Sequence, residues 1–147
     1  MPGLRVCIDV EDLERAIAFY TAALGLSVAR RLRSDWAELS GAAVPIDLLA
    51  NPAGTPASPA AAVRRDYGRH WTPLHLDVVV DDLDAAVRRA REAGAVVELD
   101  VRERPWGRIA VLADPFGHGF CLLEFRGRGY DEMLSPSGLA SPAGGGA

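Results

Sequence analysis

The chain has 147 residues, of which 49% are hydrophobic and 24% are charged, and its formal net charge is −4. This size and composition are typical of one globular domain, and the acidic balance argues against nucleic acid or an anionic membrane as the partner. No apolar run approaches the roughly 20 residues of a membrane-spanning helix, and the N-terminus lacks the apolar stretch of a signal peptide.

The first third of the chain has the pattern of one small module. Residues 4–10 alternate with the period of a strand, and one face of that strand is entirely apolar. Asp12 is placed to cap an amphipathic helix that Gly25 can end. Three further strands are expected near residues 26–33, 35–40 and 44–50. Residues 1–50 are therefore predicted to form a βαβββ module.

A Pro- and Ala-rich connector without clear periodicity, residues 51–72, separates this module from a second one in residues 73–125. In the second module a strand is followed by a helix that Asp82 caps and Gly94 ends. The strands expected here lie near residues 74–80, 95–102, 107–113 and 118–125. Residues 126–147 are expected to form a flexible, loosely attached tail.

The two modules share a sequence pattern. RVCIDVEDLERAIAFYTAALGLSV begins at Arg5, and HLDVVVDDLDAAVRRAREAGAVVE begins at His75. A repeat of this length predicts two similar units that share a core and enclose a ligand site. Because each first strand has one apolar face for its helix, its polar face is free to line a cleft. The predicted fold is α+β, with two tandem modules forming a curved mixed sheet around a concave cleft and the helices on the convex side.

The openings VEDLERAIAFYTAALGL and VDDLDAAVRRAREAG, together with the closing segment DPFGHGFCLLEF, resemble the vicinal oxygen chelate superfamily. That superfamily groups glyoxalase I, extradiol dioxygenases and bleomycin-resistance proteins, and the resemblance covers residues 4–125. In its metal-dependent members, four ligands come from the first and last strands of the two modules. By position, the resemblance assigns those places to Arg5, Asp47, His75 and Cys121.

These residue types do not favour a metal. Arginine offers no lone pair to a cation, and Cys121 stands where the metal enzymes of the superfamily usually have Glu. The alternative for Arg5 is an ion pair with Asp47 in place of the metal. A divalent metal is still possible, with His75, Asp47 and Cys121 or Glu124 as its ligands.

The remaining candidates each have a structural alternative. Trp36, Trp106 and Arg108 are expected on middle strands or their rims, where they could stack on a planar ligand or simply pack in the core. His75 could be a silent strand residue, and Cys121 could be a small core residue. The two cysteines are too few for a disulfide framework, so free thiols in the reducing cytoplasm are expected.

The sequence favours a glyoxalase- or bleomycin-resistance-like protein that binds a small hydrophobic or aromatic molecule in the inter-module cleft, without a metal. Such a protein acts by sequestration or in metal-free small-molecule metabolism. The alternative is a metal-dependent lyase, isomerase or dioxygenase of the vicinal oxygen chelate type. Whether the protein catalyses a reaction is left open, and a homodimer is expected.

Overall fold

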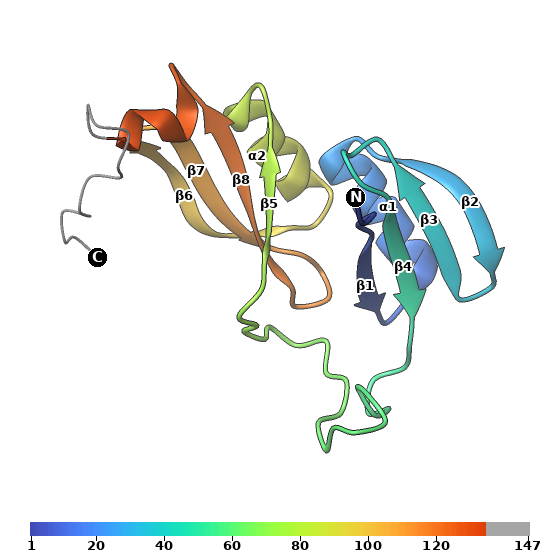
Figure 1. Ribbon diagram of the computed structural model, residues 1–147. Helices are drawn as coiled ribbons and strands as arrows, with labels where there is room; N and C mark the ends of the chain where they lie inside the picture. Colours follow the sequence, from blue (N-terminus) through green and yellow to red (C-terminus); the bar gives the residue numbers. More distant parts are fainter. Residues whose placement is uncertain (135–147) are drawn as a thin grey trace.

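The computed structural model describes residues 1–134 and has the predicted architecture of two βαβββ modules (Figure 1). In chain order its elements are β1 (Val6–Val10), α1 (Leu13–Leu24), β2 (Ser27–Arg33), β3 (Trp36–Ser40), β4 (Ile46–Ala50), β5 (Leu76–Val79), α2 (Leu83–Glu92), β6 (Val96–Arg104), β7 (Gly107–Ala113), β8 (Gly119–Phe125) and the 3-10 helix η1 (Gly129–Met133). The predicted α+β class is therefore confirmed, and the predicted strands and helices all lie within a few residues of their expected places.

Each module has its own four-stranded mixed sheet, with the orders β1-β4-β3-β2 and β5-β8-β7-β6. In both sheets the first strand pairs parallel to the last, and the other pairs are antiparallel. The edge strands β1 and β5 lie beside each other in the middle of the molecule (Figure 1). Cys7 is the register partner of Asp47, and Asp77 is the partner of Cys121. Residues of both edge strands line one cavity between the modules.

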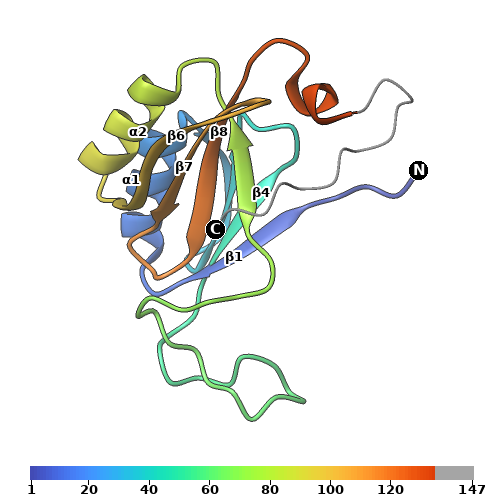
Figure 2. The ribbon, with the colours of Figure 1, turned by 90° about the vertical axis from the view of Figure 1, so that its left-hand side faces the viewer.

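Both helices lie on the same side of the sheets (Figure 2), where the apolar faces of the strands are buried. The Asp12 side chain accepts a hydrogen bond from the backbone N–H of Arg15 at 3.0 Å, and Asp82 caps α2 in the same way. Gly25 ends α1 with a φ of 68°, a conformation that suits glycine. No helix within residues 1–134 is long and apolar enough to cross a membrane.

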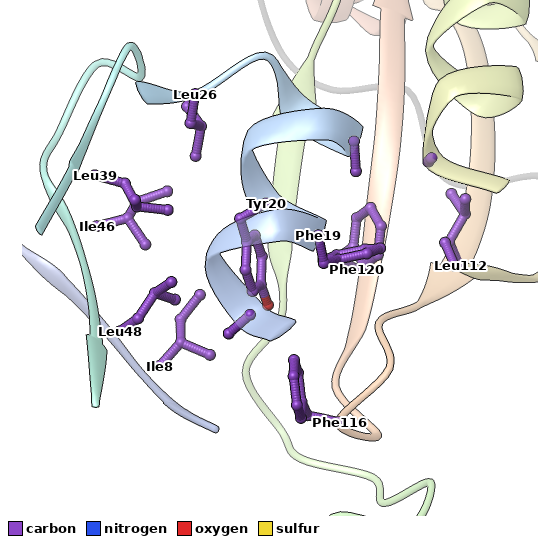
Figure 3. Close-up of a cluster of buried hydrophobic side chains, with 14 of the residues drawn as sticks. Ile8, Phe19, Tyr20, Leu26, Leu39, Ile46, Leu48, Leu112, Phe116 and Phe120 are labelled. Carbon is purple, nitrogen blue, oxygen red and sulfur yellow. The ribbon is translucent and has the colours of Figure 1, made fainter. Parts of the chain in front are cut away.

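One hydrophobic core runs through both modules (Figure 3). Phe19 of α1 packs edge-on against Phe120 of β8, with ring centroids 6.4 Å apart. Contacts of this kind stabilise through buried apolar area, at roughly 25 cal/mol per Å² removed from water. Because the shared core fixes one module against the other, it also fixes the space between β1 and β5.

A buried polar contact joins the modules beside this core. Tyr20 Oη of α1 donates a hydrogen bond to Asp114 Oδ2 at 2.5 Å, and Asp114 begins the turn between β7 and β8. Burial alone would raise the pKa of Asp114, but hydrogen bonds from His118 and Tyr20 lower it. Burial and the charge of Asp114 raise the pKa of Tyr20, which keeps the phenol a donor. The carboxylate therefore acts as an ionised link between the modules.

The connector and the start of the tail are more ordered than the sequence suggests. In the connector, Arg65 Nε donates to Asp9 Oδ2 of β1 at 2.5 Å. After β8, the Tyr130 ring of η1 packs against Trp106 and Phe125, with centroids 5.1 and 4.7 Å apart. The predicted loose tail therefore needs correction for residues 126–134, and residues 135–147 lie outside the described part of the chain.

Candidate functional site

In the first module, the predicted ligand places are taken up by an ion-pair network. Arg5 Nε and Nη2 donate to Asp47 Oδ2 and Oδ1, both at 2.8 Å, and Nη2 also contacts Glu38. Trp36 Nε1 adds a third donor to Asp47, at 3.1 Å. The ion pair expected between Arg5 and Asp47 is confirmed, and it extends to a second carboxylate.

The electrostatics of this network oppose metal binding. Asp47 is only 1% exposed, and the hydrogen bonds from Arg5 hold its pKa below the usual carboxyl range despite the cost of burial. The pKa of Arg5 is raised, first by its hydrogen bond to Asp47 and then by that to Glu38. The permanently charged guanidinium of Arg5 already pairs with the carboxylates of Asp47 and Glu38, and it would repel a metal cation placed beside them. The residues of the first module therefore do not fit a metal ion.

The second module carries a different set of groups. His75, which directly precedes β5, contacts Asp77 Oδ1 through Nδ1 at 2.9 Å, and the Cys121 Sγ lies 4.0 Å from the same nitrogen. One potential ligand atom from each of these three residues lies within 4.8 Å of the others. Burial, and then the charge of Asp77, raise the pKa of Cys121 to about 11. The thiol is therefore neutral near pH 7.

Asp77 was missing from the predicted site, although the sequence contained a signal for it. It lies two residues after His75, so strand alternation places both side chains on one face. This is the polar face of the strand, on which His75 occupies the position that corresponds to Arg5 in the first module. The structure adds Asp77 because its carboxylate contacts His75.

Two cavities meet at His75. One, of about 180 Å³, lies between β1 and β5, and its apolar lining comes from both modules: Val6, Ile8, Leu24, Leu74, Leu76 and Val78. The other, of about 270 Å³, is lined by residues that include Trp71, Val111 and Cys121. Thr72, His75, Gly119 and Phe120 line both cavities. The two cavities therefore have part of their lining in common, and His75 belongs to that part.

The other predicted site residues lie outside these two cavities. Trp36 belongs to the Asp47 network. Trp106 packs against Phe125 and Tyr130, with ring centroids 5.8 and 5.1 Å away. Burial, and then the charge of Asp77, raise the pKa of Tyr130.

The expected roles of Arg108 and Glu124 are corrected by their contacts at the start of α2. Arg108 Nη2 donates to both carboxylate oxygens of Asp84 at 2.8 Å, and Glu124 accepts from the backbone N–H of Leu83 at 2.8 Å. Arg108 and Glu124 are register partners, so both lie on the helix-covered side of the sheet. Neither side chain lines either of the two cavities that include His75.

Known proteins are similar to this chain in sequence or in fold. The chain is 38% identical over 119 residues to anthracycline biosynthesis protein DauV of Streptomyces sp. (strain C5), an alignment that covers 79% of this chain and 38% of that protein. TnmS3, an antibiotic binding protein from Streptomyces sp. CB03234, matches with a TM-score of 0.60 at 24% identity, over 86% of this chain and 97% of that one.

A third match carries a metal. The fosfomycin resistance protein FosX from Listeria monocytogenes, solved with Mn(II) and 1S,2S-dihydroxypropylphosphonic acid, matches with a TM-score of 0.64 at 19% identity, over 84% of this chain and 90% of that one. At such identities the two solved structures show the fold alone. The family model described as "Glyoxalase-like domain" matches residues 5–123. The chain therefore belongs to the glyoxalase-like family, within the vicinal oxygen chelate superfamily.

Proposed function

We propose that the protein binds a small apolar or aromatic molecule in the two cavities at His75, without a metal. The observation that carries this proposal is the cavity between β1 and β5, to which both modules contribute apolar side chains. A concave, mostly apolar space with a few polar groups is the usual form of a small-molecule site. The ion pair of Arg5 with Asp47 supports a metal-free site, since it blocks the first module's ligand places.

An aromatic ligand is favoured by Trp71. Its side chain lines the second cavity but is 82% exposed, an unusual position for a large indole unless it meets a partner. The names of two similar proteins support the same class of ligand, since one belongs to anthracycline biosynthesis and another is an antibiotic binding protein. Anthracyclines are planar polycyclic aromatics, which suit stacking on an indole. Binding of this kind would serve sequestration or a metal-free step of metabolism.

Replacing Trp71 with alanine is expected to weaken the binding of doxorubicin, an available anthracycline, about tenfold, because stacking contributes about 0.5–1.5 kcal/mol beyond the area buried. Fluorescence anisotropy of the drug measures the affinity directly. Trp106→Ala is the matched control, because Trp106 lies outside both cavities. An absence of saturable binding, or the same loss in both variants, would contradict the proposal.

A second candidate function is metal-dependent chemistry, and the group formed by His75, Asp77 and Cys121 favours it. An imidazole, a carboxylate and a thiolate can hold Zn²⁺ with one open position, where the ion would act as a Lewis acid. The raised pKa of Cys121 argues against zinc binding at this group, because the thiol must lose its proton to become a metal ligand.

If the metal reading is right, titration of the purified protein with zinc alone should give one bound ion per chain, detected by mass spectrometry under native conditions. Cys121→Ser should then lose most of this binding, because a hydroxyl is a poor substitute for a thiolate. Cys7→Ser is the control, since Cys7 lies outside the group. Zinc uptake that is absent, or equal in both variants, would rule this candidate out.

A further inference from the structure

We infer that the cavity between β1 and β5 selects, among apolar and aromatic molecules, those that carry secondary amide groups, as short peptides do. This inference rests on the proposed function and deepens it by naming the polar group that the ligand presents. The recognition comes from the backbone of the two strands, because each strand has one edge without a neighbouring strand and both of these free edges border the cavity.

The free edge of β1 carries the backbone groups of Cys7 and Asp9. β1 is the end strand of its sheet and pairs with β4. Val6 N–H donates to the Pro45 carbonyl at 3.1 Å, so Val6 directs its backbone groups toward β4. In a strand the N–H and C=O groups of successive residues point to opposite edges. Cys7 points away from β4, and two residues later Asp9 does the same.

The free edge of β5 has the same origin. β5 is the end strand of the second sheet and pairs with β8. Val80, directly after this strand, donates its N–H to the Leu123 carbonyl at 2.8 Å and so points toward β8. By the same alternation, the backbone groups of Asp77 and His75 point away from β8.

Backbone groups from both free edges border the cavity. Cys7 and Asp9 from β1 and His75 beside β5 line it together with apolar side chains. The two strands belong to separate sheets, and within residues 1–134 the N–H and C=O groups of these three residues have no backbone partner. Unpaired strand edges are the surfaces to which extended peptides add in β-augmentation. The cavity therefore has backbone donors and acceptors on two sides.

A ligand without amides would leave these groups unsatisfied. Its apolar surface would displace water from the free edges without replacing the hydrogen bonds, which opposes binding. An extended residue between two amides has N–H and C=O groups on both of its sides, as the cavity has a free edge on both sides. The side chains of Val6, Ile8 and Leu76 supply apolar contacts for the rest of such a ligand, and Trp71 is available for an aromatic ring.

Calorimetric titration with a matched pair of small probes separates the amide from the ring. N-acetylphenylalanine N-methylamide is one residue between two amides, and N-acetylphenylalanine methyl ester has the same ring but an ester oxygen in place of one N–H. The amide is expected to bind about fivefold more tightly, because the ester would leave one backbone carbonyl unpaired. Competition with doxorubicin shows whether the amide occupies the proposed site. Equal affinities for the two probes would overturn this inference and leave the proposed function standing.

Proline at position 7 tests the backbone group itself. Cys7→Pro removes an N–H on the free edge, where proline costs no hydrogen bond to β4, and it should weaken binding of the amide probe about fivefold. Cys7→Ala is the matched control, because it also lacks the thiol but keeps the N–H, and it should have a much smaller effect. Circular dichroism checks that both variants are folded. Equal affinities of the two folded variants would contradict the inference.

Hydrogen exchange followed by NMR makes the same test on the wild-type protein. Saturation with the amide probe should slow exchange of the N–H groups of Cys7 and His75. Exchange of Val6 and Val80, which already donate to Pro45 and Leu123, should change much less. Unchanged exchange at Cys7 and His75 with the probe bound would overturn the inference. Failure of doxorubicin and of both probes to bind would overturn it together with the proposed function.

Discussion

Replacement of Asp114 by alanine is expected to lower the free energy of unfolding by about 3–5 kcal/mol, the range found when a buried charged partner is removed. Asp114 is 4% exposed, and it accepts hydrogen bonds from Tyr20 Oη and from the backbone N–H groups of Phe116 and His118. Alanine would leave these donors buried without an acceptor. Urea unfolding followed by circular dichroism measures the loss.

The pH dependence provides a second readout for Asp114. Because its pKa is lower in the folded protein than in the unfolded chain, the carboxylate contributes stability above the usual carboxyl pKa of about 3.9. That contribution is lost as the pH falls through the lower, folded value. Asp114→Asn should therefore lose less stability on acidification than the wild-type protein does. Asp100→Ala, an exposed control, should change stability by no more than about 0.5 kcal/mol. If the free energy of unfolding fell with pH to the same extent in the wild type and in Asp114→Asn, the stabilising role of the ionised Asp114 carboxylate would be refuted.

Replacement of Asp47 by alanine is expected to cost about 2–3 kcal/mol, as the loss of charge-assisted hydrogen bonds does. Asp47 is buried and accepts from Arg5 and Trp36. The effect should be smaller than at Asp114, because the Arg5 side chain is 44% exposed and water can solvate it once its partner is gone.

Asp35→Ala is the matched control for Asp47, since it also removes a carboxylate that pairs with an arginine. The pair of Asp35 with Arg33 lies at the surface, with side chains 50% and 66% exposed, so its loss should cost no more than about 0.5 kcal/mol. Thermal unfolding of the two variants under one buffer condition makes the comparison. Equal losses would mean that the Asp47 network contributes nothing beyond a surface ion pair.

Local patterns were sufficient to predict the elements of the fold. The two-residue period of residues 4–10 and the caps at Asp12 and Asp82 act within a few residues of chain, so they could be recognised without knowledge of the tertiary structure. The ion pair of Arg5 with Asp47 could be predicted only with the family resemblance, which implies that the first and last strands of the module are neighbours, as they are in the structure.

The errors arose where long-range register or docking decides the outcome. Arg108 points to the helix-covered side of the sheet because it pairs with Glu124 across β7 and β8. The local sequence does not predict which residues of two strands become partners. The contact of Tyr130 with Trp106 likewise depends on how a segment after the last strand folds back. Composition identified that segment as loop-like, but composition alone does not show what a loop packs against.

Several expectations remain predictions. The boundaries at residues 50, 72 and 125, the homodimer and the cytoplasmic location follow from the sequence and from the family resemblance.

The central claim is that one ligand site lies where the two modules meet at His75. Two-dimensional ¹H–¹⁵N NMR spectra recorded during titration with doxorubicin test it most directly. The predicted result is saturable shifts of the backbone amides of Thr72, His75, Gly119 and Phe120, which line both cavities. Shifts confined to the far side of the second module, around α2 and β6, would contradict the claim, as would spectra that do not change.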